Sequence, residues 1–205
     1  MADLGFIHRF IPATVPGAPA LLLLHGTGGD ENDLLPLASR IAPGAAMLSP
    51  RGKVLEHGMP RYFRRSGEGQ WDVDDLKRRT AELAEFVKRA RDAYVIETLI
   101  AVGYSNGANI AWSLLLTEPN AFAGAILMRA MLPFDPRPLP NLSGNPILML
   151  AGRHDELIPL QQAGLLAALL GEAGADATFE VLEAGHGLTE QDLALAAEWL
   201  AERRS

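Results

Sequence analysis

Short, mostly apolar runs alternate with amphipathic segments along the chain. The runs cover residues 20–24, 45–48, 98–102, 125–128, 147–151 and 177–182. Most of these runs show no alternation of apolar and polar side chains, which is typical of strands buried on both faces of a parallel sheet. The last run does alternate, and we predict it to be an edge strand.

The segments between the runs carry helical patterns. Over residues 74–94, apolar or semi-apolar side chains recur with a period near 3.6 and predict one buried helix face. Helices are also predicted over 105–116 and 160–170, and a last helix begins at Thr189 in a capping-box pattern. Strand–helix–strand units with right-handed crossovers predict a three-layer α/β/α sandwich with a mostly parallel sheet. No break in composition divides residues 1–205, so we expect a single domain.

Two connections, over residues 49–71 and 129–145, are long and without an obvious helical or strand pattern. Such connections are often functional. Neither is long enough to form a separate lid domain. The first contains five basic side chains, namely Arg51, Lys53, Arg61, Arg64 and Arg65. These side chains could recognise a carboxylate or phosphate of a substrate, but pairing with surface acids is the favoured interpretation.

Composition and charge exclude several function classes. Of the 205 residues, 48% are hydrophobic and 21% charged, which is ordinary for a globular protein. Acidic residues outnumber basic ones by 25 to 18, and the formal net charge of −7 disfavours a nucleic-acid partner. The chain contains no cysteine, so a disulfide, a thiolate metal site and a cysteine nucleophile are excluded.

The sequence also carries no membrane or export signal. No apolar stretch approaches the ~20 residues of a membrane-spanning helix. Residues 1–5 lack the basic start and the long apolar core of a signal peptide. We therefore expect a cytoplasmic protein without a membrane partner.

The third apolar run leads into Gly103-Tyr104-Ser105-Asn106-Gly107 and then into a predicted helix. A G-x-S-x-G sequence between a strand and a helix is typical of a sharp turn that exposes a nucleophilic serine. The unpaired N–H groups at the helix start favour developing negative charge. An incidental serine in a glycine-rich turn is the alternative, but the strand–turn–helix context favours Ser105 as the nucleophile.

A serine hydroxyl needs a base to become nucleophilic. His186 follows the last predicted strand and is flanked by two glycines. Because the carboxyl ends of parallel strands share one sheet edge, we expect His186 on the same edge as Ser105. His57 lies in an irregular connection, and His8 is expected at the surface. His186 is therefore the predicted general base.

Two acidic residues, Asp155 and Glu156, follow the fifth apolar run at the same edge. Asp155 comes first after the turn and is the preferred partner of the base, with Glu156 as a solvated alternative. Asp155 could instead cap the helix that begins near Pro159. The chain order Ser105, Asp155, His186 matches the Ser…Asp/Glu…His order of α/β-hydrolases.

The first apolar run ends in His25-Gly26-Thr27-Gly28-Gly29. This turn is similar to the glycine-rich oxyanion turns of esterases. We predict the backbone N–H groups of Thr27 and Asn106 as oxyanion donors and His25 as a structural turn residue. A phosphate-binding loop is the rival interpretation, but neither the P-loop lysine pattern nor the third dinucleotide-binding glycine is present.

These motifs together resemble the α/β-hydrolase superfamily and, within it, the small lidless phospholipase/carboxylesterase family that includes acyl-protein thioesterases. The resemblance covers nearly the whole chain and implies the α/β-hydrolase fold with a sheet of about seven strands that lacks the usual first strand. Asn106 stands where acyl-protein thioesterases usually carry glutamine. Residues 50–65 look more like the bacterial hydroquinone-responsive hydrolases.

The resemblance implies a serine carboxylesterase that acts on a small or medium ester without a metal or organic cofactor. An acyl thioesterase or lysophospholipase would use the same three residues. A non-catalytic binding protein is a more remote alternative, since such proteins usually lose one of them. Dimerisation is common in the family, so a homodimer is also considered, although no residue marks an interface.

Apolar side chains of the long connections and of the turns after strands are the candidates for an acyl pocket. Core packing explains each of them equally well. These candidates are Phe63, Trp71, Met131, Leu132, Leu157 and Leu188.

Overall fold

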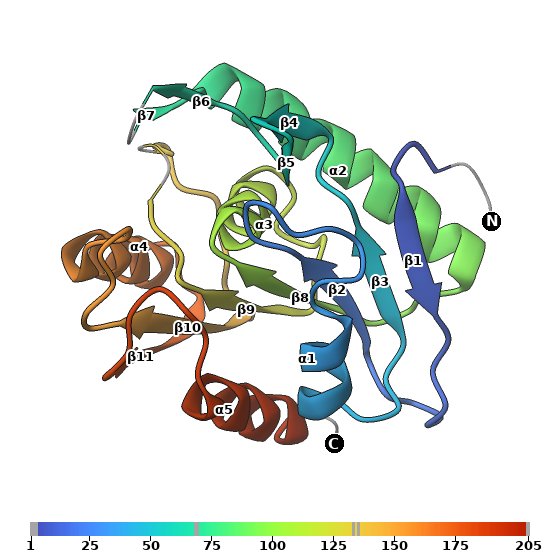
Figure 1. Ribbon diagram of the computed structural model, residues 1–205. Helices are drawn as coiled ribbons and strands as arrows, with labels where there is room; N and C mark the ends of the chain where they lie inside the picture. The colour runs from blue at the N-terminus through green and yellow to red at the C-terminus, as the bar shows by residue number, and fades with distance from the viewer. Residues whose placement is uncertain (1–3, 68–69, 133, 135, 204–205) are drawn as a thin grey trace.

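The computed structural model describes residues 4–67, 70–132, 134 and 136–203. Residues 1–3, which belong to the segment considered as a signal peptide, lie outside the described residues. One seven-stranded sheet forms its centre (Figure 1). Only the first edge strand is antiparallel to its neighbour. The prediction of about seven mostly parallel strands is confirmed. In spatial order they are β1 (His8–Ile11), β3 (Met47–Pro50), β2 (Ala20–Leu24), β8 (Leu99–Tyr104), β9 (Gly124–Met128), β10 (Pro146–Gly152) and β11 (Asp176–Leu182).

Helices cover both faces of the sheet, as the three-layer prediction requires (Figure 1). One face packs against α2 (Val73–Tyr94), α3 (Asn106–Thr117) and α4 (Leu160–Glu172), and the other against α1 (Leu35–Ile41) and α5 (Glu190–Ala201). None of the described helices is both long enough and apolar enough to cross a membrane.

The burial of β2 explains why its sequence shows no polar alternation. Leu22 and Leu24 belong to the core cluster that contains Trp112 of α3. Leu21 and Leu23 point to the opposite face and belong to a second cluster with α1 and α5. Since successive side chains of a strand point to opposite faces, a strand between two helix layers must be apolar at every position.

The helix termini also follow their sequence signals. The capping box of α5 is present, with Thr189 at the N-cap and Asp192 at the third position. At the start of α2, the side chain of Asp72 accepts a hydrogen bond from the amide of Asp75. Both caps satisfy amides that have no partner within their own helix.

The expectation that His8 lies at the surface is wrong. His8 begins β1 and is buried, with Nδ1 2.8 Å from the Phe6 carbonyl oxygen and Nε2 2.7 Å from the Tyr94 hydroxyl. Phe10 of the same strand stacks on Tyr94, with ring centroids 4.0 Å apart. The end of α2 therefore covers this edge of the sheet and buries a histidine that the sequence alone did not place.

The connection over residues 49–71 is more ordered than we expected. It contains two hairpins, β4 (Val54–Glu56) with β5 (Met59–Arg61) and β6 (Arg65–Gly67) with β7 (Gln70–Trp71).

The basic side chains of this connection all have carboxylate partners. Arg51 pairs with Glu31 and Asp30, Lys53 with Glu82, Arg61 and Arg65 with Glu56, and Arg64 with Asp72 and Asp75. The favoured interpretation, pairing with nearby acids, is thus confirmed.

Candidate active site

Ser105 occupies a strained turn between β8 and α3. Its backbone angles are φ 53° and ψ −114°, outside the regions that residues with a side chain normally adopt. Its amide donates a hydrogen bond to the Met128 carbonyl oxygen at 2.9 Å, which ties the turn to β9. Backbone strain of this kind is usually retained at functional sites.

The two glycines of the motif allow α3 to pack directly on the sheet. A Cβ atom at Gly107 would lie 1.9 Å from the Leu24 carbonyl oxygen. One at Gly103 would lie 2.7 Å from the Cα atom of Ala108. Both separations are far shorter than van der Waals contact, so the tight strand–turn–helix geometry requires glycine at both positions.

The structure brings together Ser105, His186 and Asp155 from three separate turns. His186 Nε2 lies 3.0 Å from Ser105 Oγ, and His186 Nδ1 lies 2.8 Å from Asp155 Oδ2. The imidazole is 20% exposed and the Asp155 carboxyl 1% exposed. Because the carboxylate can only accept, the proton belongs on Nδ1, and Nε2 is left to accept from the serine hydroxyl.

Asp155 divides its two carboxylate oxygens between two tasks. Oδ2 faces His186, while Oδ1 accepts from the amides of Leu157 and Ile158, each at 2.9 Å. The N-cap of α4 is Pro159, without a side-chain cap, so Asp155 does not cap that helix. Glu156 is exposed to solvent.

His25 holds the turn that follows β2. It is buried, with Nδ1 2.7 Å from the Gly26 carbonyl oxygen and Nε2 accepting from the Gly52 amide at 2.9 Å. Burial lowers the pKa of His25, which favours the neutral ring that this pattern of one donor and one acceptor needs. The structure thus gives His25 the structural position expected of it.

Two amides, one in the turn after β2 and one in the turn after β8, are the predicted oxyanion donors. In the part of the chain that the structure describes, neither the Thr27 nor the Asn106 amide donates to a protein acceptor. Their neighbours are occupied, since the Gly28 amide donates to Pro60 at 3.0 Å and the Gly29 amide to Gly26 at 3.1 Å. Asn106 is the first residue of α3, where amides lack helical partners.

The roles of the Asn106 and Asn109 side chains were missed in the sequence analysis. Asn106 Oδ1 accepts from the Tyr62 amide at 2.8 Å, and Asn109 Oδ1 accepts from the Met131 amide at 3.0 Å. The first turns of α3 therefore fasten one residue of each long connection. Polar residues on the buried side of a helix would have been the signal, since such groups need partners.

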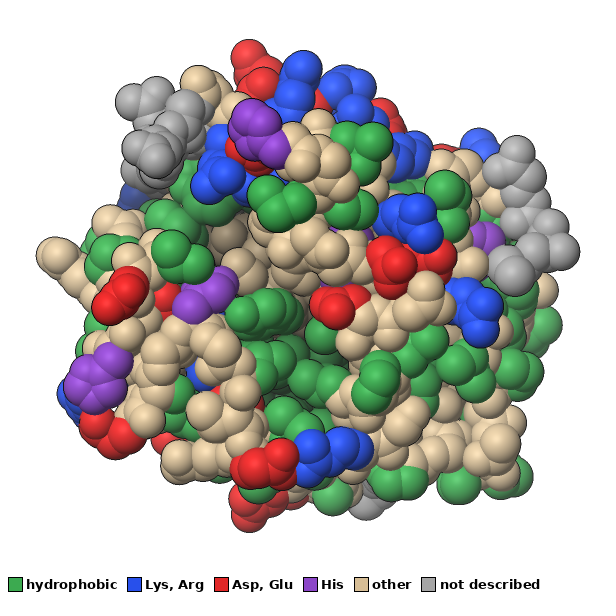
Figure 2. All heavy atoms as spheres, viewed as in Figure 1, with side chains coloured by type: hydrophobic (Ala, Val, Ile, Leu, Met, Phe, Trp, Pro, Cys, Tyr) green, Lys and Arg blue, Asp and Glu red, His purple; other side chains and the backbone are tan. Residues whose placement is uncertain are grey.

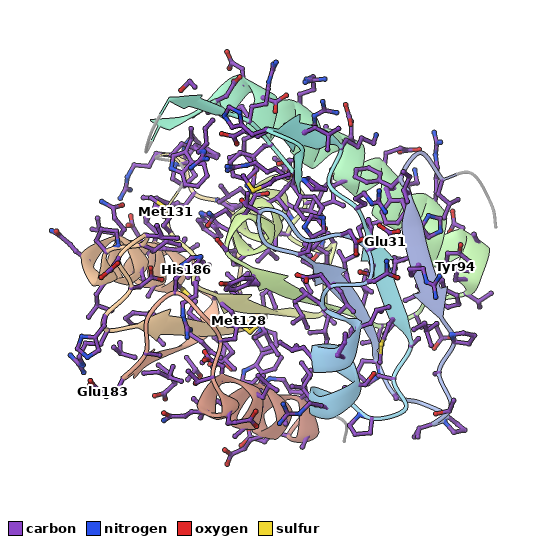
Figure 3. The ribbon with its side chains drawn as sticks, in the orientation of Figure 1. Glu31, Tyr94, Met128, Met131, Glu183 and His186 are labelled. Carbon is purple, nitrogen blue, oxygen red and sulfur yellow. The ribbon has the colours of Figure 1, made fainter. Side chains whose placement is uncertain are left out.

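The predicted pocket residues differ in exposure. Phe63 is fully buried against Trp71, with ring centroids 5.1 Å apart, and so presents no surface to a ligand in this conformation. Leu157 is 70% exposed. Three others, Met131, Leu132 and Leu188, are half-buried, as is Trp71. Hydrophobic side chains gather around a hollow on the front face (Figure 2), and Figure 3 shows Met131 and His186 on this side.

The sheet order, the strained serine turn and the histidine loop after the last strand define an α/β-hydrolase. The model of the phospholipase/carboxylesterase family matches residues 8–203, and the chain belongs to this family. The family and the relatives described below support an esterase-type hydrolase activity for this protein.

Individual relatives match over nearly the full chain. The protein named "Putative hydrolase MhqD" of Bacillus subtilis (strain 168) is 45% identical over 184 residues, which are 89% of this chain and 92% of that protein. The Bacillus cereus carboxylesterase is 43% identical with a TM-score of 0.94, over 98% of this chain and 95% of that one. A carboxylesterase from Mesorhizobium loti is 33% identical with a TM-score of 0.93, covering 98% and 97%.

Proposed function

We propose that the protein is a serine carboxylesterase that cleaves small to medium carboxylic esters through an acyl-enzyme. The observation that carries this proposal is the position of the His186 ring, which is hydrogen-bonded to Ser105 Oγ on one side and to Asp155 on the other. An imidazole held in this way can take the serine proton at Nε2 while the carboxylate stabilises the resulting imidazolium.

In the first half of the reaction, Ser105 Oγ attacks the ester carbonyl carbon and its proton passes to His186 Nε2. The carbonyl electron pair moves onto the oxygen, which the amides of Thr27 and Asn106 stabilise. When the tetrahedral intermediate collapses, the bond to the alcohol oxygen breaks. The alcohol leaves with the proton from Nε2, and the acyl group remains on Ser105.

In the second half, a water molecule replaces the alcohol. His186 Nε2 takes a proton from the water as its oxygen attacks the acyl carbon, and the same two amides stabilise the oxyanion. The bond from the acyl carbon to Ser105 Oγ then breaks. Ser105 regains its proton from His186, and the carboxylic acid is released.

The size of the proposed substrate follows from what covers the site. The connection over residues 49–71 forms two short hairpins rather than a lid domain. The half-buried Met131, Leu132 and Leu188 provide apolar surface for an acyl chain of limited length. Soluble esters therefore suit the site better than a lipid surface does.

Hydrolysis of p-nitrophenyl esters from acetate to decanoate tests the proposal, with Ser105→Ala beside the wild type. We expect activity that disappears in Ser105→Ala and persists in Ser39→Ala, which changes an exposed serine on α1. The best chain length measures the acyl pocket. Wild-type activity that survives Ser105→Ala, or no activity on any ester, would overturn the proposal.

The leaving group separates the proposal from its closest alternatives. A thioesterase and a lysophospholipase would use the same three residues and the same two amides. Rates on an oxygen ester and on a thioester with the same acyl group, and on a lysophospholipid, decide between them. The proposal requires the oxygen ester to be the best substrate of the three.

A further inference from the structure

Arg129 follows β9 directly, and its side chain is buried beneath the loop that carries His186. The guanidinium has no exposed surface. Its Nε–H donates to the Gly185 carbonyl oxygen at 2.9 Å, and Nη2 donates to the Gly187 carbonyl oxygen at 3.0 Å. These two carbonyls lie immediately before and after His186.

The other side of the guanidinium binds the first turn of α5. Nη1 donates to Asp192 Oδ1 at 2.7 Å, and Nη2 donates to Asp192 Oδ2 at 2.9 Å. Asp192 is itself unexposed and also accepts from the Thr189 amide at 2.7 Å. Arg129 therefore connects the end of β9, the histidine loop and the start of α5.

All five N–H groups of the guanidinium can be accounted for. The fifth points from Nη1 to the Leu150 carbonyl oxygen at 3.3 Å. The backbone of Arg129 has φ 55°, in the left-handed region that is unfavourable for any residue with a Cβ atom. Arg129 therefore combines an unfavourable backbone conformation with a buried side chain whose N–H groups all have hydrogen-bond partners.

Stability alone does not explain this arrangement. A buried ion pair gains little over apolar side chains of the same volume, because both charges must leave water. Apolar side chains, however, could not hold the carbonyls of Gly185 and Gly187. The hydroxyl of Tyr104 donates to the carbonyl of His186 itself at 3.1 Å, so three successive carbonyls are held in place.

We propose that Arg129 is a positioning residue for the general base, a role that rests on the proposed function. By holding the carbonyls of Gly185 and Gly187, it fixes the backbone on both sides of His186. The imidazole then stays in line between Ser105 and Asp155. Asp192 supports this role by orienting the guanidinium and neutralising its charge.

Arg129→Lys tests the proposal most directly. Lysine keeps the positive charge beside Asp192 but cannot reproduce the planar fork that reaches both carbonyls. We expect kcat on p-nitrophenyl esters to fall about 10- to 100-fold, as a displacement of about 1 Å at a catalytic group would cause. KM should stay within about twofold, because substrate contacts are not removed.

Trp199→Phe is the matched control. Trp199 is buried on α5, where it packs near Gly124 at the start of β9, and its indole nitrogen has no hydrogen-bond partner among the described residues. This variant should lower the melting temperature without changing kcat well below that temperature. If Arg129→Lys behaves like Trp199→Phe, with lower stability and normal kcat, Arg129 is only structural and the proposal is overturned.

Two measurements keep this test independent of ester hydrolysis. The first is the downfield proton resonance of His186 Nδ1–H in its hydrogen bond to Asp155, which should weaken or disappear in Arg129→Lys. The second is the rate at which a fluorophosphonate labels Ser105, which should fall with kcat. Slow labelling and a lost resonance in the variant support the proposal even if no ester is hydrolysed. Wild-type values for both overturn it.

If Arg129→Lys does not fold, Asp192→Asn replaces it. The amide keeps the shape of the carboxylate but loses one acceptor and the charge, so the guanidinium is held less firmly. We expect the same losses of kcat, labelling rate and downfield resonance, each smaller than for Arg129→Lys. Unchanged values in a folded Asp192→Asn would again overturn the proposal.

Discussion

At the scale of single residues, Asp155 has the environment that a partner of the base needs. Its carboxyl is nearly inaccessible to solvent, and each oxygen already has a defined hydrogen-bond partner. Glu156, the neighbouring acid, is exposed. The sequence favoured Asp155 because it comes first after the turn, but it kept Glu156 as an alternative because both residues follow the same strand end. The direction of the two side chains separates them.

Asp155→Asn should lower kcat by about 10⁴-fold while the protein stays folded. The amide oxygen can still accept from the amides of Leu157 and Ile158, but the amide N–H₂ group then faces His186 Nδ1 and favours the wrong ring tautomer. Steady-state kinetics and circular dichroism check both parts. Glu156→Gln is the control. A comparable loss of kcat in Glu156→Gln would show that the choice of Asp155 as the partner of His186 is wrong.

His25 makes stability depend on pH in a definite direction. Burial lowers its pKa in the folded protein, while an unfolded histidine titrates near pH 6.5. Below about pH 6.5 the unfolded chain therefore takes up a proton first, and stability is lost as the pH falls towards the folded pKa. This contribution is fully present only above about pH 6.5.

His25→Gln should make stability less dependent on pH. Urea unfolding at about pH 8 and pH 5.5 measures the loss in each protein, and the expected difference is at most about 1.4 kcal/mol, because pH 5.5 lies about one unit below the unfolded pKa. His57→Asn serves as the control because His57 is an exposed hairpin residue with φ 51°, which asparagine tolerates. Equal pH dependence in wild type and His25→Gln would contradict the argument.

At the scale of elements, the sequence predicted the strands and helices that have a clear local pattern of apolar side chains or capping residues. The five-residue apolar run of β2 is too short for a buried helix and indicates a strand between two layers, and the capping box marks the start of α5. By contrast, β1 has four residues with mixed burial, and α1 has seven, too few for a periodic pattern. Their formation depends on partners distant in the chain, such as Pro50 opposite His8.

The turn between β8 and α3 provides a prediction about glycine. Gly107→Ala should disrupt folding or activity, because the new methyl group would lie 1.9 Å from the Leu24 carbonyl oxygen. Gly164→Ala is the matched control, since in the interior of α4 no described heavy atom beyond the neighbouring helix backbone lies within 4 Å of its Cβ position. This control should stabilise the protein by about 0.5–1 kcal/mol. Thermal unfolding and ester hydrolysis measure both effects, and a normally active Gly107→Ala would contradict the packing described.

Arg129 shows why part of the candidate site escaped sequence analysis. A lone arginine after an apolar strand looks like the polar end of that strand. Its burial depends on Asp192, 63 positions later, and on carbonyls that no side-chain pattern reveals. Ser105 and Asp155 were easier to find because each follows a strong apolar strand, and His186 because it follows the alternating last strand between two glycines. The carboxyl ends of these parallel strands place all three residues at one sheet edge.

At the scale of the whole molecule, the chain is acidic, and the basic side chains of the connection over residues 49–71 are already paired with carboxylates. The formal net charge is −7, and Arg51, Lys53 and Arg65 each pair with a carboxylate. Exposed pairs of this kind contribute little to stability. They nevertheless occupy the cations that could otherwise attract an anionic substrate. We therefore expect the molecule to favour neutral esters.

Two esters of similar length test this expectation, the p-nitrophenyl ester of pentanoic acid and the p-nitrophenyl monoester of glutaric acid. The neutral ester should have a kcat/KM about 2- to 10-fold higher at low salt, and the difference should shrink as salt screens the charge of the protein. Arg65→Gln, which removes an exposed partner of Glu56, should leave this preference unchanged or increase it. A preference for the anionic ester that disappears in Arg65→Gln would instead show that the basic connection recognises a substrate carboxylate, and the ion pairs seen here would then have to open when that substrate binds.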